Sequence, residues 1–274
     1  MRPAISSIGP EIFLSQGARL IAFTGAGGKT SLIRCLATHL ETHLQRVITT
    51  TTTKIFPVPG AHTVLQDDAP DFAGRIRHAL SSSLHIVVAR RFDLASGKLI
   101  GLDKDTVTAL HEAKLEATIL VEADGAARKP LKAPASHEPV IPQGTDFCVG
   151  VMGLDAVSCR LVESNVHRHE IFSRITGLAP SHFVSPSHMT RLALAPDGLF
   201  KGCPVQCNRF VFLNKIDIPG GYGMAEEFSD MLTQNVQAAD FQWVAGSTRF
   251  QRFTRIVRKT RKAWFLTCNE LVCS

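Results

Sequence analysis

Residues 19–31 read RLIAFTGAGGKTS, and this stretch decides the fold. The apolar run 19–24 predicts a short strand, and residues 29–44 predict a helix because leucines recur every four positions. A glycine loop between a strand and a helix turns backbone N–H groups toward an anion, and the helix N-terminus adds partial positive charge. The stretch therefore predicts a phosphate-binding loop.

The loop assigns particular roles to its residues. Lys29 is expected to reach the β- and γ-phosphates, and the Thr30 hydroxyl is expected to ligate Mg²⁺. The usual pattern, G-x-x-x-x-G-K-[ST], would place a glycine where Phe23 stands, and the chain instead matches the shorter G-x-x-G-K-[ST] of Mur-type ligases. The alternative is a glycine-rich turn that a lysine follows by chance. The predicted nucleotide contacts here are Gly25, Ala26, Gly27, Gly28, Lys29, Thr30 and Ser31.

The rest of the chain alternates strand-like and helix-like segments. Residues 117–123 (ATILVEA) form a near-continuous apolar run, as expected for a strand buried on both faces of a parallel sheet. We predict a P-loop NTPase-like α/β fold, with a mostly parallel sheet, helices on both faces and an inserted segment. The other predicted strands are 45–53, 84–89, 147–152, 210–213 and 241–245, and the other predicted helices are 69–80, 104–113 and 224–238.

Two carboxylates end the buried strand, in the sequence Glu122-Ala123-Asp124-Gly125. The C-terminal edge of a parallel sheet is where ligands bind in such folds. We expect Asp124 or Glu122 to support the Mg²⁺ shell or to orient a water molecule, with Thr30 and Asp124 as the metal contacts. The catalytic candidates are thus Lys29, Asp124 and Glu122, and the alternative is a solvated strand end.

A third motif, Asn214-Lys215-Ile216-Asp217, follows the predicted strand 210–213. In GTPases an N-K-x-D motif reads guanine, because its aspartate accepts hydrogen bonds from base N–H groups that adenine does not present in the same pattern. Asn214, Lys215 and Asp217 are therefore predicted to bind the base. The alternative is a polar turn after a strand, which Asn and Asp favour in any protein.

Six stretches together resemble the selenium-dependent hydroxylase accessory proteins of the YqeC family. They are TGAGGKTS, ITTTTTKIFP, VEADGAARKPLKAPASHEPVIP, VGVMGLDA, VHRHEIFSRITG and FLNKIDIP, spread over residues 10–248. The chain departs from the family where His169 replaces a commoner proline and where the residues after Thr248 show no resemblance to it. The resemblance implies a P-loop NTPase-like protein associated with maturation of selenium-dependent molybdenum hydroxylases.

These observations favour a nucleotide-binding accessory protein that uses Mg²⁺ with GTP or ATP and turns over slowly as an NTPase. Its expected partners are the nucleotide and a molybdenum hydroxylase or its maturation factors. One alternative is an ATP-dependent ligase or kinase, which the Mur-like loop suggests, and another is a non-catalytic nucleotide-gated scaffold. The sequence leaves open the choice between guanine and adenine, the cargo, the partner enzyme and the oligomeric state.

Other residues carry weaker signals. Lys129, Lys132, His137 and Glu138 lie in a proline-stiffened loop that is either a switch or substrate clamp, or a rigid connection. The run 49–54 (TTTTTK) either approaches the γ-phosphate or is a β-branched strand end. A last group matches no standard zinc spacing and is interpreted as polar surface: Cys159, His167, His169, Glu170, Cys203 and Cys207.

Composition and charge limit the other function classes. The net charge of +6 arises within residues 249–274, where seven lysines and arginines face one glutamate, so the first 248 residues are neutral and no nucleic acid is expected as a partner. Seven irregularly spaced cysteines, with no secretory signal or membrane-length apolar run, predict a cytoplasmic protein.

The expected organisation is a domain over residues 1–248, an insert of weaker structure at 154–206, and a basic tail at 249–274. If the tail is helical, its aromatic residues share one face and most cations lie opposite. It would then contact an acidic partner or a membrane surface, and the alternative is a packed terminal helix or a divergent end.

Overall fold

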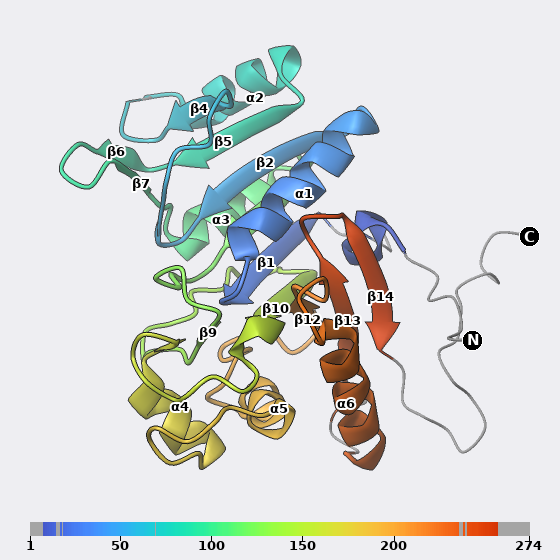
Figure 1. Cartoon of the computed structure of the whole chain (residues 1–274). Helices are drawn as coiled ribbons and strands as arrows, with labels where there is room; N and C mark the ends of the chain where they lie inside the picture. Colours follow the sequence, from blue (N-terminus) through green and yellow to red (C-terminus); the bar gives the residue numbers. More distant parts are fainter. Residues whose placement is uncertain are drawn as a thin grey trace, which may run out of the picture.

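The computed structural model describes residues 8–14, 17, 19–68, 70–235, 238 and 240–256 of the 274-residue chain. A central sheet is built from strands β1 (Leu20–Gly25), β2 (Arg46–Thr51), β4 (His62–Leu65), β5 (His85–Ala89), β8 (Ala117–Glu122), β10 (Phe147–Gly153), β12 (Asn208–Asn214), β13 (Gln242–Ser247) and β14 (Arg252–Ile256). Within the described residues these nine strands lie in the order β14-β13-β12-β10-β1-β8-β2-β5-β4 (Figure 1).

The pairing of the strands confirms the predicted mixed α/β fold with a mostly parallel sheet. Every neighbouring pair is parallel except β13 and β14, which are antiparallel. β1 lies between β10 and β8, and all six of its residues are buried. The ends of β1 and β8 therefore meet at one edge of the sheet, which is where the glycine loop and the two carboxylates follow.

Helices cover both faces of this sheet. On one face, Ile21 and Phe23 of β1 pack with α1 (Lys29–Thr42) and the short helix η1 (Pro10–Phe13). On the other face, Leu20 packs with α2 (Phe72–Ser82) and α3 (Lys104–Glu112), and Ala22 joins the cluster that contains α6 (Gly221–Gln234). Apolar side chains that alternate between two helical layers explain why the strands read as continuous hydrophobic runs.

Residues 154–206, expected to be an insert of weaker structure, contain regular elements. These are η3 (Leu154–Ala156), β11 (Val166–His167), α4 (His169–Thr176) and α5 (Pro186–Leu194). Phe172, Met189 and Leu192 are fully buried in the same cluster as α6, and β11 pairs with β9 (Leu131–Lys132). The division of the chain into a domain and a separate insert stays a prediction.

Two features were not anticipated. A small sheet of β3 (Lys54–Ile55), β6 (Arg91–Asp93) and β7 (Lys98–Ile100) lies beside the main sheet, next to β2 and β5 (Figure 1).

The helical interpretation of the tail is wrong for Arg252–Ile256, which form β14 against β13. Phe253 is buried and its ring meets those of Phe13 and Phe212, so this stretch belongs to the core. Residues 257–274, including Trp264, lie outside the described residues.

Candidate functional site

The glycine loop that joins β1 to α1 has a backbone that few other residues could adopt. Gly27 has φ +81°, and a Cβ there would lie 2.2 Å from the Gly153 nitrogen. Gly28, the residue before α1, has φ +131°, and its Cβ would lie 2.2 Å from the Asn214 side-chain nitrogen. Both values lie in the region that L-residues rarely populate, so the loop is held close to its neighbours by having no side chains.

The loop presents unused backbone donors. The N–H of Ala26 donates to the carbonyl oxygen of Val151, and that of Gly27 donates to the carbonyl oxygen of Lys129. For residues 28–31, by contrast, no backbone N–H has an acceptor among the described residues. Free N–H groups at a helix N-terminus form a site that favours anions.

Lys29 is buried directly beneath this loop, with 3% of its surface exposed. Its ammonium lies 2.9 Å from Asp124 Oδ1 and 3.8 Å from Glu122 Oε1, and it donates to the carbonyl oxygen of Gly25 at 2.5 Å. The lysine is therefore held inside the fold by the two carboxylates that end β8.

Glu122 and Thr30 form the polar mouth of the site. The Thr30 hydroxyl donates to Glu122 Oε2 at 2.9 Å. Burial raises the pKa of Glu122, while Lys29 and Thr30 act in the opposite direction. Mg²⁺ prefers oxygen ligands such as carboxylates and hydroxyls. Glu122 and Thr30 supply one of each beside the unpaired backbone N–H groups of the loop, so these two residues fit that ion.

Asp124 occupies a different environment from the one expected of a metal contact. It is 1% exposed, accepts from the Gly25 N–H at 3.0 Å, and lies 3.1 Å from the ammonium of Lys132 as well as beside Lys29. Two ammonium groups and a backbone donor already surround it. In this geometry Asp124 holds the loop and Lys29 in place, and Glu122 is the carboxylate that reaches the cleft.

A buried chain of charges continues from Asp124 into residues 154–206. Lys132 is 1% exposed and bonds Glu138 Oε2 at 2.7 Å, and Glu138 also accepts from Arg168, the residue before α4. Burial alone would raise the pKa of Glu138, but the hydrogen bonds from Arg168 and Lys132 outweigh it and lower the pKa to about 2. Of the four residues predicted in this loop, Lys132 and Glu138 are thus internal, and His137 is exposed.

The N-K-I-D segment lies against the glycine loop. The Asn214 side chain donates to the carbonyl oxygen of Gly27 at 2.9 Å and accepts from the Thr248 N–H at 3.1 Å. Lys215, with φ +71°, forms an ion pair with Asp155. Asp217 is exposed, lines the same cleft, and has no hydrogen-bond partner among the described residues.

One cleft of about 1010 Å³ connects these parts. Its wall includes the glycine loop, Glu122 and the N-K-I-D segment, as predicted, so the structure brings all three motifs to one cavity. It also includes side chains that no sequence motif marks as ligand contacts: Arg34, Phe56, Lys98, Arg128 and Arg249. Phe56 and Arg128 stand inside conspicuous motifs, but neither residue type by itself marks a ligand site.

The threonine run at the end of β2 is used within the fold. The Thr51 hydroxyl donates to the carbonyl oxygen of Glu122 at 2.7 Å, and the Thr52 hydroxyl donates to that of Val140 at 2.8 Å. Lys54 lines the cleft, whereas Thr49 and Thr50 are buried in the sheet. The run anchors β2 to the strand that carries Glu122.

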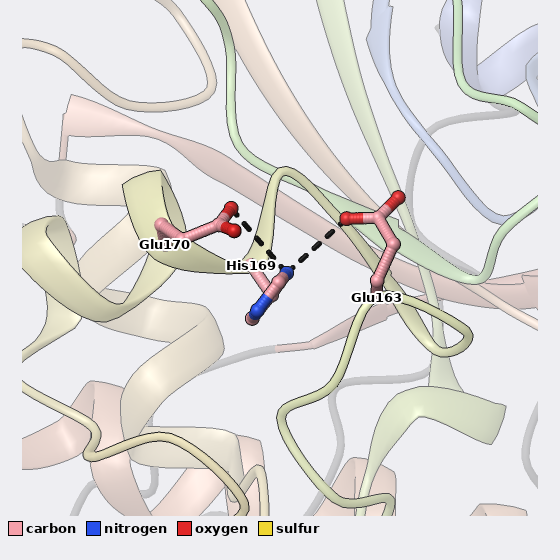
Figure 2. A group of neighbouring side chains, drawn as sticks. All are labelled: Glu163, His169 and Glu170. Atoms are coloured by element: carbon pink, nitrogen blue, oxygen red, sulfur yellow. Dashed lines mark hydrogen bonds and ion pairs between the residues drawn. The ribbon is translucent and has the colours of Figure 1, made fainter.

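The histidine-rich segment gathers three possible metal ligands, Glu163, His169 and Glu170, whose ligand atoms lie within 4.8 Å of one another. Figure 2 shows the His169 ring between the two carboxylates, with Nδ1 3.1 Å from Glu163 and 3.3 Å from Glu170. Glu163 also binds the Lys129 ammonium, which with His169 lowers its pKa to about 2. Glu163 is thus already paired with a cation of this chain, and both Glu163 and Glu170 are exposed.

Among the described residues, no cysteine belongs to such a group. Cys203 and Cys207 are free thiols; Cys207 is buried in the core with Cys148 and Cys203 packs against that cluster, so the interpretation of these two residues as polar surface is wrong. Cys159 is also free, and it is not part of the group around His169.

A strand, glycine loop and helix at the centre of a mostly parallel sheet, with helices on both faces, define a P-loop-like α/β protein. Residues 21–170 match the model of the family described as "YqeC protein". The protein described as "Uncharacterized protein YqeC" of Escherichia coli (strain K12) is 36% identical over 199 residues, which cover 72% of this chain and 75% of that protein. The chain belongs to the YqeC family.

The family match covers the glycine loop, the carboxylates of β8 and the charge chain up to Arg168, but the N-K-I-D segment lies beyond residue 170. No solved structure matches the chain. Within the described residues, none of the helices has both the length and the apolar character that crossing a membrane requires.

Proposed function

We propose that the protein binds a nucleoside triphosphate together with Mg²⁺ at the loop between β1 and α1. One observation carries the proposal: four backbone N–H groups at residues 28–31 have no acceptor among the described residues and stand at a cleft, directly above the buried Lys29. Phosphate oxygens would supply the missing acceptors. The Lys29 ammonium would then shift from Asp124 toward a phosphate oxygen, and Thr30 and Glu122 would lie beside the metal ion.

Guanine is the base that the geometry supports best. Asn214 joins Gly27 to Thr248, so the phosphate loop, the N-K-I-D segment and the turn after β13 form one connected surface. Asp217 ends this surface as an exposed carboxylate that can accept hydrogen bonds from a base. Adenine presents its donor in a different position, so GTP should bind more tightly than ATP.

The expected activity is slow hydrolysis of the bound nucleotide. In phosphoryl transfer the protein contributes positioning and charge stabilisation, which here fall to Lys29, Thr30 and Glu122. Asp124 would act through Lys29, by fixing the position of its ammonium.

The nucleotide state would gate an accessory role in the maturation of selenium-dependent molybdenum hydroxylases. Membership of the YqeC family and the resemblance from which that role was inferred support this assignment. The chain Lys29–Asp124–Lys132–Glu138–Arg168 offers a physical route from the phosphate site to the start of α4. A partner that contacts residues 154–206 could then distinguish the nucleotide-bound protein from the free one.

A second candidate is an ATP-dependent kinase or ligase, which the length of the cleft favours. The cavity continues past Glu122 to residues of β3 and β7, where an acceptor molecule would have room. Consumption of ATP only in the presence of an acceptor acid or alcohol, with no response to GTP, would select this candidate.

The proposal is tested by a nucleotide panel read by thermal unfolding, with and without Mg²⁺. A ligand present at about 100 times its Kd adds roughly 2.7 kcal/mol to the stability of the native state. We expect GTP to raise the melting temperature most, and only with Mg²⁺ to its full extent. If no nucleoside triphosphate shifts the melting temperature under either condition, the proposal is wrong.

A further inference from the structure

The cleft extends to the side of the phosphate loop away from the N-K-I-D segment. Along the sheet edge the order is β12, β10, β1, β8 and β2, so Asn214 stands at one end, the loop in the middle and Glu122 beyond it (Figure 1). Four strand spacings of about 4.8 Å separate β12 from β2 by roughly 19 Å. Residues 54–58, which follow β2, therefore lie past the position expected for the terminal phosphate.

An aromatic side chain stands in this far part of the cleft. Phe56 is 53% exposed, although most phenylalanines of the chain's core are fully buried. The Lys98 ammonium lies 4.9 Å from the centre of its ring, and the Arg128 guanidinium carbon lies 5.3 Å from it. One ring thus gathers two cations that come from different parts of the chain.

Neither cation is neutralised. For Lys98 and Arg128, no carboxylate lies within ion-pair distance among the described residues. Arg34 and Arg249 of the same cleft also have none among the described residues, whereas its other four lysines, Lys29, Lys54, Lys129 and Lys215, each have a carboxylate partner. Two like charges over one ring, neither with a carboxylate partner, repel each other, and a nearby anion would relieve that repulsion.

The backbone that presents Arg128 is strained. Ala127 and Arg128 have φ +47° and +59°, so two consecutive non-glycine residues adopt the left-handed conformation. Such residues are energetically unfavourable and cluster at ligand sites. The turn is held in place because the Lys129 carbonyl oxygen accepts from the Gly27 N–H.

We propose that Phe56, Lys98 and Arg128 form a second ligand site, for a small anion that carries a planar aromatic ring. The ring of the ligand would stack on Phe56 by displacing one of the two cations from the ring face, and the carboxylate or phosphate of the ligand would pair with the displaced cation. The site is separate from the nucleotide contacts and borders the end of the phosphate loop next to Glu122. Binding there does not require that the proposed nucleotide function be correct.

The protein contains its own control for an ordinary surface pair. Phe183 is 56% exposed and has the Arg160 guanidinium carbon 4.7 Å from its ring centre, but neither residue lines the cleft. Phe56 differs in its second cation and in its place in the cavity. If any exposed phenylalanine–arginine pair bound aromatic anions, replacing Phe183 would weaken binding as much as replacing Phe56.

The test is a titration of the full chain with 2-naphthoate, whose fluorescence reports its binding. Cyclohexanecarboxylate, a non-planar anion of equal charge, is then tested as a competitor that displaces 2-naphthoate. We expect 2-naphthoate to bind in competition with salt, and cyclohexanecarboxylate at least tenfold more weakly. Phe56→Ala should weaken 2-naphthoate at least tenfold, Arg128→Ala and Lys98→Ala should each weaken it measurably, and Phe183→Ala should leave it unchanged. Equal affinities of the wild type and Phe56→Ala, or an equal loss in Phe183→Ala, would overturn the proposal.

Two further measurements separate this site from the nucleotide site. Lys29→Met should retain 2-naphthoate binding, and Phe56→Ala should retain GTP binding to within about threefold. If 2-naphthoate is lost in Lys29→Met and displaced by GTP, the probe occupies the phosphate loop and the second site does not exist. If 2-naphthoate binding depends on Phe56 while no nucleotide binds, the second site stands and the proposed nucleotide function fails.

Discussion

The side chain of Asn214 donates a hydrogen bond to the carbonyl oxygen of Gly27, 2.9 Å away across 187 positions of sequence. This contact joins the end of β12 to the loop after β1, although β10 separates the two strands in the sheet. It is possible because Gly28 has no side chain to occupy the space of the Asn214 amide. The glycine loop and the N-K-I-D segment therefore form one structural unit.

The first prediction concerns the fit of the loop. Gly27→Ala should destabilise the fold by several kcal/mol, because its Cβ would meet the backbone of Gly153 and Pro130 at 2.2 and 2.6 Å. Gly60→Ala is the matched control, since Gly60 has a similar φ of +78° and no atom within 4 Å of the added Cβ. It should cost about 1–2 kcal/mol, from backbone strain alone. Urea unfolding measures both, and equal losses would show that the loop is not tightly packed.

The second prediction concerns the base. Asp217→Asn should shift the preference from GTP toward xanthosine triphosphate, because the amide offers a donor where the carboxylate offers an acceptor. Asp197→Asn, at another exposed aspartate outside the cleft, should change neither affinity. Competition titrations with the three triphosphates provide the measurement. Wild-type protein that binds ATP as tightly as GTP would refute guanine recognition and favour the kinase or ligase alternative.

The third prediction concerns acid stability. Glu138 has a pKa of about 2 in the folded protein, below its ordinary value of 4.5, so it binds its proton less readily when folded. Its contribution is fully present above pH 4.5 and is lost as the pH falls toward 2; the shift corresponds to about 3 kcal/mol. The stability difference between the wild type and Glu138→Gln should therefore shrink over this pH range. Glu227→Gln, at an exposed position on α6, should show no such trend, and a constant difference for Glu138→Gln would contradict the buried charge chain.

The fourth prediction concerns the C-terminal residues. A chain that ends at Ile256 should keep nucleotide affinity within a few-fold, whereas a chain that ends at Thr248 should lose at least about 3 kcal/mol of stability, because Phe253 is a core residue. Ending at Ile256 also removes Arg258, Lys259, Arg261 and Lys262. Any salt-sensitive binding of the full chain to anionic vesicles should therefore weaken. Equal melting temperatures of the two shortened chains would show that β14 contributes nothing to the core.

Local sequence patterns sufficed for much of the fold. The strand, loop and helix at residues 20–42, and the buried strand β8, appear within one or two residues of the predicted bounds. Each rests on a local signal, either hydrophobic periodicity or a glycine loop. β14 was not predicted because its two buried apolar residues, Phe253 and Ile256, are three positions apart, which is a helical spacing; in the strand they lie on opposite faces and join two different core clusters.

The sequence indicates which residues form the candidate site, but it does not indicate the role of each one. Lys29, Thr30 and Glu122 meet as their motifs predict. The sequence could not show that Asp124 is enclosed by Lys29 and Lys132, because that arrangement depends on a contact with a proline-rich loop that looks exposed. Buried ion pairs between distant segments carry no local signature, and neither does the exposure of Phe56.

Because Lys29 is buried against two carboxylates, its replacement affects stability as well as nucleotide binding. Removing Lys29 leaves Asp124 and Glu122 with less compensation inside the fold, and breaking such a buried pair typically costs about 3–5 kcal/mol. A change in melting temperature alone would therefore mix stability with binding. Affinity must be measured directly, on variants whose circular dichroism shows that they are folded, and Thr30→Ala provides a milder second variant.

Isothermal titration of GTP in the presence of Mg²⁺ tests the account most directly. The wild type and Lys104→Met, which alters an exposed lysine on α3, should bind with equal affinity. Lys29→Met should bind at least about 100-fold more weakly, roughly 2.7 kcal/mol, because it loses the charged contact to phosphate. Thr30→Ala should lose most of the gain in affinity that Mg²⁺ provides. A folded Lys29→Met protein that binds GTP as tightly as the wild type would contradict the assignment of this loop as a phosphate site.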